Sequence, residues 1–169
     1  REVQGAADRA PLEFLHSLSD LIRGRITYET GRTHPGTTAE EAVIHGYGVC
    51  QDHAHIFIGA ARANGIPARY VSGYLMMDDR IEQEATHAWA EAHVEGLGWV
   101  GFDVSNGISP DPRYVRVATG SDYRDAAPVT GISFGGATDE VLTVGVAVEA
   151  KPTAGLSQSQ SQSQGQSTQ

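Results

Sequence analysis

The chain has 169 residues, of which 40% are hydrophobic, and a formal net charge of −9 at pH 7. This length and composition fit one globular domain with a sizeable core. Lys151 is the only lysine and the arginines form no cluster, so the charge pattern argues against nucleic acids and anionic membranes as partners. No apolar run is long enough to cross a membrane, and the N-terminus has no signal-peptide pattern.

The chain begins at Arg1 rather than at a methionine, and we expect an upstream domain or leader in a longer protein. We predict one domain over residues 1–150. Residues 151–169 form a low-complexity tail that is rich in serine and glutamine. Such a tail buries too little apolar surface to offset the entropy lost on ordering, so we expect it to be disordered. The single cysteine has no disulfide partner, which favours a reducing compartment and predicts a cytoplasmic location.

The first part of the chain has helical patterns. Apolar residues recur at helical spacing over residues 11–26, with proline in the first turn. The sequence Thr-Ala-Glu-Glu from Thr38 is a capping box, which predicts a short helix that ends near Gly46. A third apolar stripe runs over residues 50–64, where Asn-Gly and a following proline end the helix.

After Pro67 the pattern changes to strands. Residues 68–76 are rich in aromatic and β-branched residues. Two further strands, over 85–95 and 99–104, flank a short glycine-containing connection and predict a β-hairpin. The remaining predictions are a turn at 78–79, strands over 114–118 and 141–148, and a glycine-rich loop over 127–138.

The lone cysteine, Cys50, falls in the first turn of the predicted helix over 50–64. One cysteine can form neither an intrachain disulfide nor a cysteine-rich zinc site, so it is either a small buried residue or a nucleophile. The first turn of a helix offers unpaired N–H groups and the positive end of the dipole, which both favour a thiolate. Asp52 opposes this effect, because a nearby carboxylate disfavours the anion.

The predicted hairpin brings a histidine close to a carboxylate. If residues 93–94 face residues 98–99, His87 lies within a few positions of Asp103, and a bulge of the usual kind would close the gap. An imidazole beside a carboxylate is an oriented general base, because the carboxylate fixes the tautomer and stabilises the imidazolium. Cys50, His87 and Asp103 are therefore the candidate catalytic residues.

The two faces of the strand that carries His87 differ. One face is small and apolar, as expected for a core face, and holds Ala88, Ala90, Ala92 and Val94. The other face holds His87, Trp89, Glu91 and His93. Two arrangements satisfy this pattern: either the sheet is covered on both sides, or the candidate site lies at one end of it.

Four segments, in this order and spacing, resemble the bacterial transglutaminase-like domain: GVCQD at 48–52, GIPARYVSGY at 65–74, HAWAE at 87–91 and GWVGFD at 98–103. The resemblance extends from about residue 12 to about residue 148. It implies an α+β, papain-related fold, in which N-terminal helices include a nucleophile helix packed on an antiparallel β-sheet. It also implies Cys50 as nucleophile, His87 as base and Asp103 as orienting acid. Many relatives carry a β-rich domain upstream.

The chain departs from this family pattern at two places. Val104-Ser105 follows Asp103 where many relatives have Pro-Thr, and His53 stands where an aromatic residue is more usual. The oxyanion hole is half defined: the Cys50 N–H is one natural donor. The second donor could be Gln51 or Tyr28, and the sequence does not choose between them.

The predicted reaction is cleavage of an amide by a cysteine peptidase or amidase through a thioester acyl-enzyme. The expected partner is a peptide or protein amide substrate, with no cofactor and no metal, and the oligomeric state is open. One alternative is a transglutaminase, in which an amine replaces water as acceptor. A second is a non-catalytic binding or scaffold module with the same fold.

A third alternative concerns zinc, because Cys50 and His53 could share a helix face with His87 and bind a metal ion together with Asp103 or water. Single residues also have structural interpretations. We expect Trp89 and Trp99 to serve in packing or pocket walls, and Arg69 to be a structural ion-pair partner.

Overall fold

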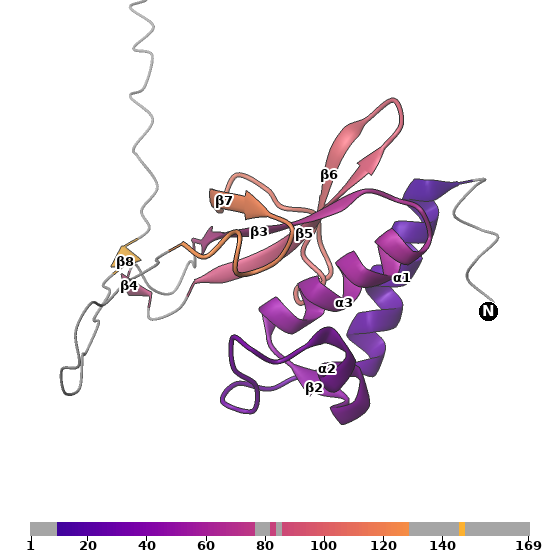
Figure 1. Ribbon diagram of the computed structural model, residues 1–169. Coiled ribbons are helices and arrows are strands. Elements are labelled where there is room, and N and C mark those ends of the chain that lie inside the picture. Colours follow the sequence, from indigo (N-terminus) through magenta and orange to yellow (C-terminus); the bar gives the residue numbers. More distant parts are fainter. Residues whose placement is uncertain (1–9, 77–81, 84–85, 129–145, 148–169) are drawn as a thin grey trace, which may run out of the picture.

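The computed structural model describes residues 10–76, 82–83, 86–128 and 146–147. Helices α1 (Pro11–Arg25), α2 (Ala39–His45) and α3 (Cys50–Ala63) precede most of the strands. The strands are β1 (Thr27–Tyr28), β2 (Tyr47–Gly48), β3 (Ala68–Leu75), β4 (Glu82–Gln83), β5 (His87–Val94), β6 (Gly98–Phe102), β7 (Tyr114–Gly120) and β8 (Val146–Ala147). Helix α3 packs against the main sheet, and α1 lies beside α3 (Figure 1). The predicted α+β, papain-related class is confirmed by this architecture and by the structural comparisons below.

The three predicted helices are confirmed, with bounds within about two residues of those expected. The capping box is formed as predicted: the Thr38 N–H donates to Glu41 Oε2 at 2.8 Å, and the Glu41 N–H donates to Thr38 Oγ1 at 3.2 Å. Gly46 then ends α2 in the left-handed conformation, at φ 74°, which a glycine adopts without strain. Residues 11–25 bury one face of α1, through Phe14, Leu15, Leu18 and Ile22.

The main sheet has the strand order β6-β5-β3-β7, and each neighbouring pair is antiparallel. The predicted hairpin is confirmed with the expected register, since Val94 pairs with Gly98 and Ala90 pairs with Phe102. The ladder ends there. Asp103 leaves β6 and forms an isolated bridge with Ile108, so a turn, rather than a bulge within the ladder, determines where its side chain lies.

Both faces of β5 are covered. Ala88, Ala90, Ala92 and Val94 are at most 5% exposed and belong to the core shared with α1 and α3. On the opposite face, Trp89 and Glu91 are each only 2% exposed. Tyr114 packs edge-on against Trp89, and Arg69 and Arg116 form ion pairs with Glu91. The sheet is therefore covered on both sides at the middle of β5, which is the first of the two arrangements left open by the sequence. His87 is the first residue of the strand and lies at its end.

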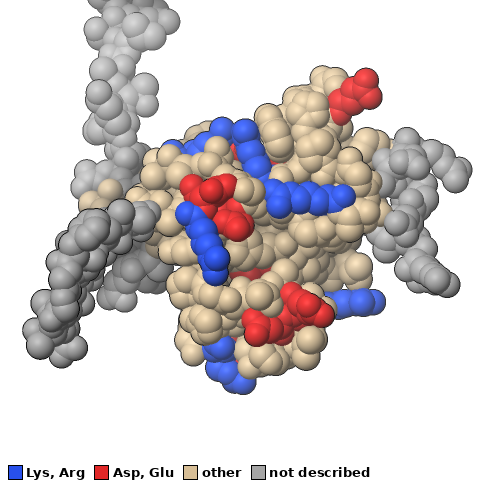
Figure 2. Space-filling view, in the orientation of Figure 1, with Lys and Arg blue, Asp and Glu red and all other residues tan. Residues whose placement is uncertain are grey.

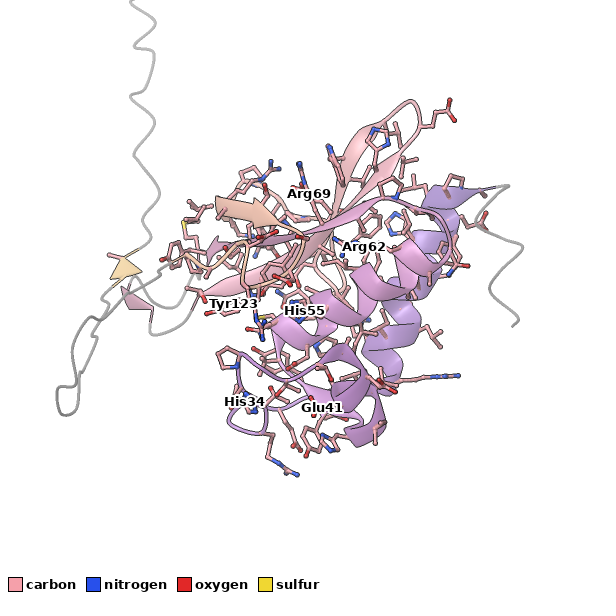
Figure 3. All side chains as sticks on the ribbon, in the orientation of Figure 1. His34, Glu41, His55, Arg62, Arg69 and Tyr123 are labelled. Carbon is pink, nitrogen blue, oxygen red and sulfur yellow. The ribbon has the colours of Figure 1, made fainter. Side chains whose placement is uncertain are left out.

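A turn after β7 is attached to α3 by polar contacts (Figure 3). The Arg62 guanidinium donates to the carbonyl oxygens of Ala68 at 2.8 Å and of Ser121 at 2.9 Å. The Tyr123 N–H donates to the His55 ring at 3.2 Å. These contacts connect the sheet edge to the helix that begins at Cys50.

Acidic and basic side chains alternate over the face seen in Figure 2. Within the described residues, no helix is both long and apolar enough to cross a bilayer. Several predictions lie outside the described residues: the turn at 78–79, the loop from residue 129 onward, the last strand apart from Val146–Ala147, and the tail over 151–169.

Candidate active site

Cys50 is the first residue of α3, and a compact turn presents it. Asp52 Oδ2 accepts the Val49 N–H at 2.8 Å and the Thr33 hydroxyl at 2.7 Å. The Asp52 carboxylate, which is 1% exposed, therefore caps the helix. Gly48 makes room for it, because a Cβ at Gly48 would lie 2.6 Å from the Asp52 Cβ. Gly48, two residues before the cysteine, is thus required for close packing of this turn.

The structure brings Cys50, His87 and Asp103 together. His87 Nε2 lies 2.6 Å from Asp103 Oδ2, and the Cys50 thiol is close enough to the same ring to raise the pKa of His87. Because Nε2 is engaged by Asp103, the nitrogen left for the thiol is Nδ1. The His87 side chain is 14% exposed, the Asp103 side chain is fully buried, and Cys50 is partly exposed.

Two further residues hold the Asp103 carboxylate. Asn106 Nδ2 and the Tyr114 hydroxyl each donate to Oδ2 at 2.7 Å, and the Asn106 N–H donates to Oδ1 at 3.2 Å. Sequence reasoning did not assign a site role to either residue. Asn106 could have been recognised as the end of a turn that begins at Asp103. Tyr114 lies at the start of another strand and has no sequence signal that links it to Asp103.

These contacts set the charge state of the site. Burial alone would lower the pKa of His87, but its hydrogen bonds to Asp103 and Cys50 outweigh burial and raise the pKa to about 9. Burial would raise the pKa of Asp103, but hydrogen bonds from His87, Tyr114 and Asn106 lower it below its usual value. Burial, followed by the bond to Asp103, raises the pKa of Tyr114. At neutral pH the pair is therefore an imidazolium and a carboxylate.

His53 does not join this group. Its two ring nitrogens lie against backbone carbonyl oxygens, Nδ1 at 2.9 Å from Val49 and Nε2 at 3.1 Å from Ile26. Both nitrogens are thus engaged, and the zinc alternative is not favoured. No group of three potential metal-binding side chains occurs in the part of the chain that the structure describes.

The tryptophans and Arg69 have structural contacts, as predicted. Arg69 pairs with Glu91 at 2.7 Å, and its guanidinium lies 4.1 Å from the centre of the Trp99 ring. Trp89 is buried against Tyr114.

Comparisons with known proteins identify relatives of the chain. Residues 1–104 match the sequence model of the Transglutaminase-like superfamily. Uncharacterized proteins of Mycobacterium tuberculosis and Mycobacterium leprae are 39% and 34% identical to the chain, over 83% and 79% of its length. These alignments cover 48% and 50% of the mycobacterial proteins, so the chain spans about half the length of the curated relatives it matches.

Solved structures give the same result for the fold. A crystal structure of a candidate cysteine protease from Cytophaga hutchinsonii is 35% identical, with a TM-score of 0.60, and the match covers 68% of this chain and 38% of that one. Calcium-bound LapG from Legionella pneumophila is 16% identical, with a TM-score of 0.55 and 70% of each chain covered, which is a similarity of fold alone. The superfamily model covers more than half of the chain, and the fold of the chain matches that of the solved structures. The chain therefore belongs to the transglutaminase-like superfamily.

Proposed function

We propose that the chain is a cysteine peptidase or amidase that cleaves an amide bond through a thioester acyl-enzyme. Cys50 is the nucleophile, His87 the general acid and base, and Asp103 the residue that orients the imidazole. One observation carries the proposal: the partly buried His87 imidazole lies 2.6 Å from the Asp103 carboxylate through Nε2, and the chain's single thiol, Cys50, contributes to the raised pKa of the same ring.

The reaction has two halves. The Cys50 sulfur forms a bond to the amide carbonyl carbon, His87 gives its proton to the leaving nitrogen, and the C–N bond breaks to leave a thioester. Water then loses a proton to His87 and attacks the thioester, which releases the acid and restores the thiol. The Cys50 N–H, unpaired at the start of α3, donates to the oxyanion in both halves.

The charge state of His87 suits the first half. With its pKa raised to about 9, the ring is an imidazolium at neutral pH and provides the proton that the leaving amine needs. The Asp103 carboxylate holds that imidazolium in place.

Trapping of the acyl-enzyme tests the proposal. Wild-type protein is incubated with a library of peptides and small amides, and intact mass spectrometry detects the covalent acyl group. We expect an adduct on Cys50 in the wild type and none in Cys50→Ala. A second measurement lets water and primary amines compete for the acyl group. Preference for amines would identify a transglutaminase. A folded wild type that forms no adduct, and whose Cys50 reacts with a thiol probe like a free cysteine, would instead support the non-catalytic module.

The pH dependence of acyl-enzyme formation is expected to follow His87. Because the pKa of His87 is raised from 6.5 to about 9, the imidazolium is present below that pH and is lost above it. Acylation by an amide should therefore fall as the pH rises through about 9, since the leaving amine loses its proton donor. Alkylation of Cys50 by iodoacetamide should not fall there, because it needs only the thiolate.

Asp103→Asn provides the matched control, because it removes the carboxylate that raises the pKa of His87. The alkaline limit should move to lower pH in this variant. If acylation fell at the same alkaline pH in the wild type and in Asp103→Asn, this fall could not be assigned to His87.

A further inference from the structure

We propose that a cleft along α3 binds a carboxylate of the peptide substrate, a few residues away from the amide that Cys50 attacks. This inference rests on the proposed function above and deepens it, because it names a chemical feature of the substrate. Three features of the structure support it: the position of the cleft along the nucleophile helix, its open floor, and the charges and hydrogen-bond donors that line it.

The cleft lies between one face of α3 and two loops. It has a volume of about 290 Å³, and its walls are residues 35–39, before α2, and residues 121–124, after β7. Its floor is a stripe of α3 whose members are three or four residues apart and therefore share one side of the helix: His55, Ile58, Gly59 and Arg62. In Figure 3 the loop that carries His34 lies below His55 and Tyr123.

The helix itself determines how far the cleft lies from the nucleophile. His55 follows Cys50 by five residues and Arg62 follows it by twelve, which is about 8 and 18 Å along the helix axis. The wall also begins close to the nucleophile, since Gln51 Nε2 donates to the Pro35 carbonyl at 3.1 Å. An extended peptide advances about 3.3 Å per residue, so a substrate that follows α3 places residues about two to five positions from the cleaved amide in the cleft.

Gly59 leaves the floor of the cleft open. A Cβ at this position would have no other atom within 4 Å, so close packing does not require a glycine here. Helix stability does not favour one either, because a glycine loses more conformational freedom on folding than an alanine does. The missing side chain does, however, leave space for a bound group between the two walls.

The lining of the cleft carries more positive than negative charge, although the whole chain has a net charge of −9. Arg62 and Arg124 line it together with a single carboxylate, that of Asp122. Among the described residues, neither arginine has a carboxylate partner, and the Arg62 guanidinium donates only to backbone carbonyls. The Asp122 carboxylate accepts the Arg124 N–H at 2.8 Å and the Asp125 N–H at 3.1 Å. Two guanidinium groups without a counter-charge favour a carboxylate as ligand.

His55 adds an uncharged donor to this lining. Its Nε2 accepts the Tyr123 N–H at 3.2 Å, so the proton of the neutral ring is on Nδ1. Burial lowers the pKa of His55 below its ordinary value, which keeps the ring neutral at pH 7. No hydrogen bond to Nδ1 is found in the part of the chain that the structure describes. A carboxylate can therefore accept this N–H, whereas a cationic group would meet two arginines.

Peptide binding to Cys50→Ala tests the inference without the chemical step. A peptide that acylates the wild type is varied so that one Glu occupies each position up to five residues from the cleaved amide, and each Glu peptide is compared with its Gln counterpart by fluorescence polarisation. We expect the Glu peptide to bind about 3- to 10-fold more tightly at one or more positions two to five residues away, as for a charged group bound by partly exposed arginines. High salt should reduce this preference. Peptides with a free or an amidated C-terminus show whether a terminal carboxylate serves equally.

Two further variants of Cys50→Ala test the cleft itself. Arg124→Gln should reduce the preference for Glu over Gln by about 2- to 5-fold, with little change for the Gln peptide. Gly59→Leu fills the floor and should weaken the binding of both peptides by about 10-fold or more, as overpacking does. The matched controls are Arg25→Gln and Gly24→Leu, because both residues lie in α1 and outside the cleft, and an added Cβ at Gly24 also has nothing within 4 Å. These controls should bind both peptides as Cys50→Ala does.

The outcomes separate this inference from the proposed function. If the wild type forms an acyl-enzyme but Glu and Gln peptides bind equally at every position and amidation has no effect, the carboxylate site is wrong and the proposed function stands. Equal losses of binding in the cleft variants and in their controls would also overturn the site. A wild type that no peptide acylates would overturn both proposals.

Discussion

His87→Ala is expected to reduce acyl-enzyme formation at neutral pH by about 100- to 10,000-fold, the usual contribution of a general acid and base. The physical cause is the loss of the imidazolium, which gives its proton to the leaving amine. Alkylation of Cys50 by iodoacetamide should fall less, because that reaction has no leaving amine to protonate. Quenched-flow mass spectrometry of the two reactions separates these effects.

His93→Ala is the control for this variant. His93 lies on the same strand and on the same face as His87, but near the hairpin end, where its ring packs edge-on against Trp99. It should acylate at the wild-type rate. If His87→Ala and His93→Ala lost activity equally, the loss would reflect damage to β5, and the assigned role of His87 would be wrong.

Gly73→Ala is expected to destabilise the fold by about 3 kcal/mol, the upper part of the range for overpacking. A Cβ at Gly73 would lie 1.9 Å from the Val115 carbonyl oxygen and 2.9 Å from Trp89 Cη2. The first contact is with backbone, so strand β7 would have to shift rather than a flexible side chain. Urea denaturation followed by circular dichroism measures the change in the free energy of unfolding.

The same shift would reach the candidate site, because β7 begins at Tyr114 and Gly73 pairs with His87 across the sheet. We therefore expect slower acylation in the Gly73→Ala variant even where it is fully folded. Gly59→Ala is the matched control, since Gly59 lies in α3 with nothing within 4 Å of an added Cβ. It should stabilise the protein by about 0.5–1 kcal/mol through helix propensity. Equal stability of the two variants would show that the close contact at Gly73 relaxes without cost.

Local patterns account for the parts of the fold that were predicted correctly. The capping box at Thr38 and the proline at Pro11 act within one turn of helix, so neighbouring residues suffice to define those helix starts. The register of the β5–β6 hairpin follows from its short connection at Gly96 and Gly98, which both have positive φ.

The contact between His87 and Asp103 was predicted, but for a reason that is only partly right. The hairpin ladder ends at Phe102, and Asp103 bridges Ile108 instead of continuing beside β5. The turn that follows supplies Asn106, and β7 supplies Tyr114. Neither contact could be predicted from spacing, because it depends on how a turn and a distant strand pack around a buried carboxylate.

The sequence by itself determined the helices, the hairpin, the family, and the three residues proposed for catalysis, because each depends on local periodicity or on motifs in a fixed order. Tertiary structure alone decided that both faces of β5 are covered, that both His53 ring nitrogens lie against backbone carbonyl oxygens, and that Asn106 and Tyr114 hold Asp103. It also decided that the Gln51 side-chain amide donates to the Pro35 carbonyl. These features join residues far apart in the chain, and the pairing of strands and the packing of the core determine which of them meet.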